Sequence, residues 1–185
     1  MWNDVLEFLK SPIYKEDENR EWSYRFSVFL KLLGLALVFS IILGLFVSLV
    51  QTVFDLDFGK HAIEEALEKY PLYFLFIGAV FIAPILEEII FRGPLFFFNG
   101  SKYFKFFFYA SVLIFGFYHM TNFEITSTTL LLSPLLVSPQ LSVGALLGFI
   151  RVRFGLLWAI ALHAVYNLLL VGPVLILKVL DIPLE

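Results

Sequence analysis

Six polar side chains stand out because they lie in otherwise apolar stretches of the sequence. They are Glu87, Glu88, Arg92, His119, His163 and Asn167. Carboxylates and imidazoles are the usual general acids and bases, and imidazole or amide N–H groups stabilise a developing oxyanion. Such a set suits hydrolysis by an activated water. The chain has no cysteine to act as a nucleophile, and none of the serines in its apolar stretches sits in a Gly-x-Ser-x-Gly elbow.

Helical spacing separates the roles of the two glutamates. Glu88 and Arg92 are four residues apart, so they share a helix face and can form a structural ion pair. Glu87 is rotated by about 100° from Glu88 and lacks a partner within its own helix. We therefore expect Glu87 to be the general base and the pair to be supporting.

The two membrane histidines complete the expected site. His163 and Asn167 are also four residues apart, which predicts that both donate to the oxyanion. His119 would help Glu87 to orient and deprotonate the water that attacks a peptide carbonyl. A simpler alternative is that each histidine only makes hydrogen bonds within a helix bundle. The third histidine, His61, lies in an acidic loop and is expected to be solvated.

Charge-free runs identify the elements that must position these residues. The runs are 32–54, 70–86, 106–123, 125–150 and 154–177. A helix that crosses a bilayer needs about 20 apolar residues, and backbone within lipid must satisfy its own hydrogen bonds. The composition is 60% hydrophobic, above the roughly 45–50% of soluble domains. We therefore predict an all-α, polytopic transmembrane helix bundle of about five to seven helices. Pro134 and Pro139 are expected to divide 125–150 into a re-entrant piece and a helix.

The sequence divides into a polar leader, 1–26, and a single transmembrane domain, 27–185. Apolar residues at helical spacing near the start of the leader predict a short helix on the membrane surface, although a disordered leader with a chance stripe is the alternative. Most basic residues outside the spans fall on the N-terminal side, which predicts a cytoplasmic N-terminus. They are Lys10, Lys15, Arg20, Arg25, Lys102, Lys105, Arg151 and Arg153, against Lys60, Lys69 and Lys178 on the other side. The net charge of −3 gives no basic surface for nucleic acid.

Three short motifs resemble those of the CAAX-protease and bacteriocin-processing family, also called the CPBP or Abi family. They are Glu87-Glu88-Ile-Ile-Phe-Arg92, Phe115-Gly-Phe-Tyr-His119 and His163-Ala-Val-Tyr-Asn167. The glycine-rich stretch from Gly144 to Gly155 also resembles the lead-in to the family's last motif, so the resemblance covers roughly residues 70–171. It implies an intramembrane endopeptidase. It also implies that the first glutamate and the histidine of the second motif position the water and that the last motif forms the oxyanion site.

The resemblance also bears on cofactors, partners and location. Because such enzymes were long called metalloproteases, a zinc site of Glu87, His119 and His163 stays open, but without H-E-x-x-H a metal-free reaction is favoured. The expected partners are a peptide or membrane-protein substrate and the lipid bilayer, with no nucleic acid. The small chain resembles bacterial members, which places it in the bacterial inner or cell membrane. The prenylated substrates of eukaryotic relatives are not carried over.

Two other classes of function fit parts of the pattern. A catalytically silent relative would use the same fold to bind a membrane partner or to confer immunity. A transporter or channel would also bury charges, but this short chain has no duplicated half and gathers its polar residues in one cluster.

Overall fold

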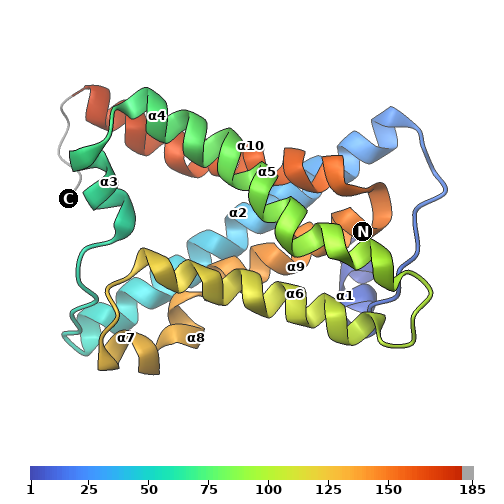
Figure 1. The fold of residues 1–185 in the computed structure, drawn as a ribbon, viewed down its shortest axis with the longest axis horizontal. Helices are drawn as coiled ribbons and strands as arrows, with labels where there is room; N and C mark the ends of the chain where they lie inside the picture. Colours follow the sequence, from blue (N-terminus) through green and yellow to red (C-terminus); the bar gives the residue numbers. More distant parts are fainter. Residues whose placement is uncertain (181–185) are drawn as a thin grey trace.

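The computed structural model describes residues 1–180 as a bundle of helices, shown in Figure 1. No strand occurs within these residues, so the predicted all-α fold is confirmed. The last five residues of the predicted domain 27–185 lie outside the described part of the chain.

Three helical segments are long and apolar enough to cross a membrane: Trp22–Val53, Leu72–Phe98 and Leu156–Val179. The first is α2 and the third is α10. The second is a succession of turns of different pitch. It consists of α4 (Leu72–Ile77), the π-helix η1 (Gly78–Ile82), α5 (Ala83–Glu87), the π-helix η2 (Glu88–Arg92) and the 3₁₀-helix η3 (Gly93–Phe98). Because these helices are long and apolar enough to span a bilayer, the chain is an integral membrane protein.

The other two apolar runs form shorter helices than the sequence predicted. Run 106–123 becomes α6 (Phe104–Tyr118) followed by the 3₁₀-helix η4 (His119–Asn122). Run 125–150 is divided into α7 (Ser127–Leu131), α8 (Ser133–Leu136) and α9 (Ser138–Phe154). The division at Pro134 and Pro139 is confirmed, and each proline lies in the first turn of its helix, where its missing N–H costs nothing.

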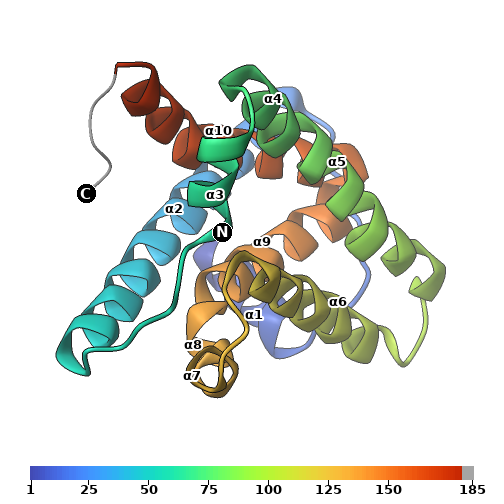
Figure 2. The same cartoon turned by 60° about the vertical axis from the view of Figure 1, so that its left-hand side comes forward.

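Helix α9 lies at the centre of the bundle and packs against α2, α6 and α10, as Figure 2 shows from the side. Glycines allow this close packing. A Cβ atom added to Gly148 would lie 2.6 Å from the ring of Phe108, and one added to Gly144 would lie 2.9 Å from the ring of Phe115. Both rings are buried, so α6 and α9 approach each other only because these positions lack side chains.

The leader packs against the bundle. It contains helix α1 (Trp2–Lys10), whose Val5 is fully buried and whose Phe8 ring lies edge-on to Phe108 and Phe149. The predicted amphipathic stripe therefore faces protein along at least part of its length. Whether α1 also lies on a membrane surface stays a prediction.

The segment after α1 is fixed to the end of α9. Arg151 donates to the Tyr14 hydroxyl over 3.2 Å, and Arg153 pairs with Asp17 over 2.7 Å. Burial alone would raise the pKa of Asp17. The hydrogen bonds that Asp17 accepts from Arg153, from the Asn19 N–H and from Tyr24 outweigh burial and leave the pKa below its ordinary value. Asp17 therefore stays ionised and holds the leader against α9.

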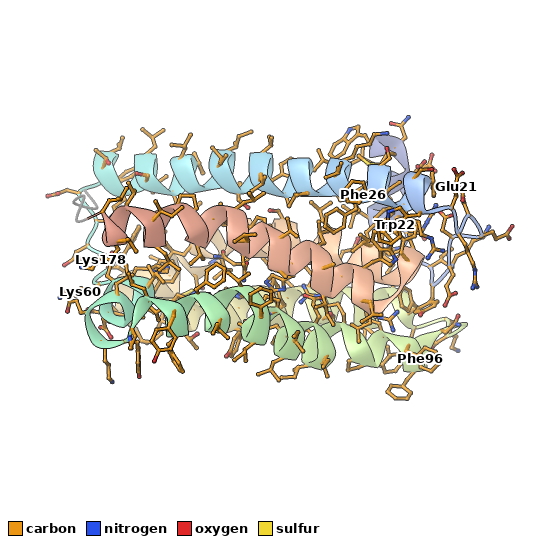
Figure 3. The ribbon with its side chains drawn as sticks, turned by 90° about the horizontal axis from the view of Figure 1, so that it is seen from above. Glu21, Trp22, Phe26, Lys60, Phe96 and Lys178 are labelled. Carbon is orange, nitrogen blue, oxygen red and sulfur yellow. The ribbon has the colours of Figure 1, made fainter. Side chains whose placement is uncertain are left out.

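The long helices run side by side and define two ends of the molecule, visible in Figure 3. Glu21, Trp22 and Phe96 lie at one end, whereas Lys60 and Lys178 lie at the other. We call the first the leader end, because α1 and the segment after it pack there. Contacts of Lys105 with Lys10, and of Arg153 with Asp17, place several of the basic residues counted above at the leader end.

Candidate active site

A proline shapes the helix that carries the two glutamates. Pro84 has no N–H, and the turn before it widens to a π-helix in which the Ala83 N–H donates to Gly78 O. In this register the carbonyl of Ala79 would be paired with the nitrogen of Pro84, so it has no donor in its own helix. The side-chain amide of Asn167 on α10 donates to this carbonyl over 2.8 Å. One of the two amide hydrogens of Asn167 therefore binds backbone.

Glu88 is the centre of a buried polar group. Its Oε1 atom lies 3.2 Å from Nη1 of Arg92 and 3.0 Å from Nδ1 of His163. Both Glu88 and Arg92 are fully buried, and the ion pair expected from their spacing is present. The guanidinium of Arg92 also donates to Gly144 O over 3.3 Å and lies 3.8 Å from the ring centroid of Phe115. Helices η2, α9 and α10, with Phe115 of α6, thus meet at one charge pair.

Glu87 points away from this ion pair, as its rotation along the helix predicted. Its Oε2 atom is buried, has no hydrogen-bond partner among residues 1–180 and lies 3.8 Å from Nε2 of His163. The imidazole of His163 therefore lies between two carboxylates, with Nδ1 on Glu88 and Nε2 facing Glu87. The sequence paired His163 with Asn167, whereas in the structure these two side chains contact different parts of the 72–98 helix.

His119 lies where α6 ends and η4 begins. Its Nδ1 atom lies 2.9 Å from the carbonyl oxygen of Phe115, so Nδ1 carries the proton and Nε2 is left to accept one. The ring of Phe115 stands between the two histidines, with its centroid 4.8 Å from that of His119 and 5.8 Å from that of His163.

The histidines line one cavity of about 470 Å³ toward the end opposite the leader. Its apolar lining comes mainly from α3 and α10. Its polar lining residues come from the N-cap of α3 and from η4, α9 and α10: His61, His119, Asn122, Gln140, His163, Tyr166 and Asn167. Glu87 does not line this cavity. It lies in a mostly apolar groove lined by side chains of residues 78–91 and by Tyr118, and its Oε2 atom lies 3.8 Å from Nε2 of His163, a residue of the cavity lining.

His61 and Gln140 are cavity residues that the sequence analysis missed. The expectation that His61 is solvated is wrong. It is partly buried, caps helix α3 (Ala62–Lys69) and packs edge-on against Phe123 at 5.2 Å. Gln140 lies in the first turn of α9. No motif contains either residue, and only the packing of distant segments brings them to the cavity.

The possible zinc ligands do not form a metal cluster. Within residues 1–180, no three His, Asp or Glu side chains are grouped closely enough to hold a metal ion. Nδ1 of His163 contacts a carboxylate and Nδ1 of His119 a carbonyl, so Nε2 of each ring is left free. It is the spacing of Glu87, His119 and His163 in this arrangement that does not fit zinc.

Replacing Glu88 tests the buried ion pair. Glu88→Gln should lower the free energy of unfolding by about 3–5 kcal/mol, because it leaves the guanidinium of Arg92 buried without a counterion. Thermal unfolding in detergent measures this effect. Glu87→Gln is the matched control. Glu87 has no hydrogen-bond partner on its buried oxygen, so its loss should cost much less. Equal losses in both variants would contradict the assignment.

The cap of α3 should depend on pH. Burial lowers the pKa of His61 below its ordinary 6.5, although Glu64 partly offsets this, and the neutral ring accepts the N–H of Ile63. A lowered pKa in the folded state means that the cap contributes fully above pH 6.5 and weakens as the pH falls below it. Losing a cap costs about 1 kcal/mol, or roughly a fivefold fall in amide-exchange protection of α3. His61→Asn keeps a cap without a titrating ring, so its protection should not change between pH 7 and pH 5.

Comparison with known proteins agrees with the motifs. A family model described as Type II CAAX prenyl endopeptidase Rce1-like matches residues 69–169, more than half of the chain. All six residues singled out above lie inside this match, and the resemblance noted over roughly 70–171 is confirmed. No curated protein and no solved structure matches the chain. The chain belongs to the Type II CAAX prenyl endopeptidase Rce1-like family, the CAAX-protease and bacteriocin-processing family of membrane proteases.

Proposed function

We propose that the protein is an intramembrane endopeptidase that hydrolyses a peptide bond with a water activated by Glu87 and His119. The observation that carries this proposal is the buried, unpaired oxygen of Glu87 beside His163. A carboxylate with a buried, unpaired oxygen in an apolar bundle is available for proton transfer, whereas its neighbour Glu88 is held through Oε1 by Arg92 and His163.

The proposed reaction uses free atoms of Glu87, His119, His163 and Asn167. Water lies between the Glu87 carboxylate and Nε2 of His119, and Glu87 accepts its proton as the oxygen attacks the peptide carbon. Breakdown of the tetrahedral intermediate breaks the C–N bond. Glu87 returns the proton to the leaving nitrogen, which yields a new carboxyl terminus and a new amine terminus.

The oxyanion is stabilised by His163 and Asn167 in this proposal. In this proposal His163 carries a proton on each ring nitrogen: Glu88 accepts from Nδ1 and holds the ring, and Nε2, next to the Glu87 carboxylate, donates to the oxyanion. Asn167 has a second amide hydrogen besides the one that binds Ala79 O. Pro84 matters to this step because the carbonyl that it leaves free orients the amide.

The catalytic variants test the proposal directly. In purified protein in detergent, assayed with a library of internally quenched peptides, Glu87→Gln and His119→Ala should each lower cleavage by about 100-fold or more. Both variants should remain folded. Glu65→Gln, an exposed glutamate on α3, is the matched control and should cleave at the wild-type rate. A Glu87→Gln variant that retains activity would contradict the proposed mechanism.

Assays with a chelator distinguish metal-free hydrolysis from zinc-dependent hydrolysis. Cleavage by the wild type should persist after treatment with a strong chelator. If chelation abolishes cleavage and zinc restores it, the metal-dependent reaction replaces the one proposed. If the folded wild type cleaves no peptide, the silent partner-binding role gains support.

We further propose that the leader end is cytoplasmic, because most basic residues gather there. The chain has no cysteine, so single cysteines report sidedness without interference. Lys60→Cys, at the end opposite the leader, should react with a membrane-impermeant maleimide added to intact cells. Lys102→Cys should react only after the cells are broken. Both lysines are exposed, and the reverse pattern would invert the proposed orientation.

A further inference from the structure

One polar group in the cavity has no role in the reaction described above. The side-chain oxygen of Gln140 is buried and has no hydrogen-bond partner in the described part of the chain. Gln140 nevertheless lines the cavity with His119 and His163. A buried amide oxygen without a donor destabilises the empty protein, so a group that binds in the cavity is its natural partner.

A bound peptide needs such a partner. A peptide bond is open to attack only where the chain is not folded into a helix, and an extended chain has lost its own backbone hydrogen bonds. In a low-dielectric cavity each unpaired N–H or C=O is costly. The walls beside Gln140, including Val143 and Leu170, offer no polar atoms, whereas a carboxamide can accept from an N–H and donate to a C=O.

Gln140 lies in the first turn of α9, one turn before Gly144, whose carbonyl binds Arg92. The two positions lie on the same face of the helix. Gln140 lines the cavity together with His119 and His163, the two histidines of the proposed reaction.

We propose that Gln140 is a substrate-binding residue that hydrogen bonds the backbone of the peptide bound in the cavity. This inference rests on the proposed function for the identity of the ligand. The cavity lining has no Asp, Glu, Lys or Arg, so it offers no counterion to either terminus of a peptide. The segment it binds is therefore an internal, uncharged and mainly apolar one.

The test measures binding, so that its result does not depend on hydrolysis. The protein is the full chain carrying Glu87→Gln, and the probes are end-capped octapeptides of Leu, Ala and Phe. The tightest binder is then remade as a set of analogues, each with one amide N–H replaced by an ester oxygen. Gln140→Met, of similar shape without the amide, should weaken binding of the parent peptide roughly five- to tenfold.

A double-mutant cycle identifies the bonded N–H. One ester analogue should bind the Gln140 protein roughly five- to tenfold more weakly than the parent, yet bind Gln140→Met as well as the parent does. Gln51→Met, at the exposed end of α2, replaces the only other glutamine in the chain and should leave all affinities unchanged. The inference is overturned if Gln140→Met binds the parent peptide with wild-type affinity. It is also overturned if every ester analogue that binds the Gln140 protein more weakly than the parent binds Gln140→Met more weakly as well. Failure of all octapeptides to bind the folded protein overturns it as well.

Two measurements distinguish this inference from a purely structural role of Gln140 and from the proposed hydrolysis. A purely structural glutamine would lower the thermal unfolding midpoint when replaced, whereas Gln140→Met should leave it unchanged or raise it because an unpaired buried oxygen is removed. Gln140-dependent binding together with no cleavage by the wild type would retain this inference and overturn the proposed hydrolysis.

Discussion

The structure depends on one constraint, the burial of the Glu88–Arg92 ion pair in an apolar bundle. Removing two charges from water is costly, and their mutual attraction compensates only if the remaining polar atoms are also bonded. Three other helices supply part of this bonding: His163 from α10, the Gly144 carbonyl from α9 and the Phe115 ring from α6. Among the described residues, Oε2 of Glu88 and Nε of Arg92 keep no hydrogen-bond partner. The charge pair thus sets how these helices meet, and Gly144 lacks a side chain because a Cβ would lie 3.1 Å from the guanidinium.

The same arrangement decides which polar atoms remain free. Glu88 and Arg92 are held by each other and by neighbours, Asn167 binds the carbonyl opposite Pro84, and His119 is oriented by its own helix. Glu87, Gln140 and Glu88, the last through Oε2 only, keep buried oxygens that have no hydrogen-bond partner among the described residues. A rigid, bonded frame around a few unpaired groups is what an active site requires, because those groups need no reorganisation before they act.

The features of this arrangement that depend on neighbouring residues were predicted from the sequence, whereas those that depend on packing between distant segments were not. The spacing of Glu88 and Arg92, the rotation of Glu87 and the helix breaks at Pro134 and Pro139 depend on a few neighbouring residues, and the structure contains all of them. The place of His163 between two carboxylates depends on how α10 packs against the 72–98 helix, which no spacing within either helix encodes. His61 and Gln140 reach the cavity for the same reason. The leader looked like a surface helix because its stripe has the same periodicity whether it faces lipid or protein.

The two ends of the bundle differ in a way that suits the proposed reaction. At the leader end, the Phe8 ring packs on Phe108 and Phe149, and Asp17 and Tyr14 pair with arginines of α9. Toward the other end, the cavity is lined by the start of α9, the middle of α10 and the capped start of α3. If an extended peptide binds there as proposed, its backbone would pair with the amide of Gln140 in the cavity that His119 and His163 also line. The free energy gained at the amide would then be used to position the carbonyl for attack.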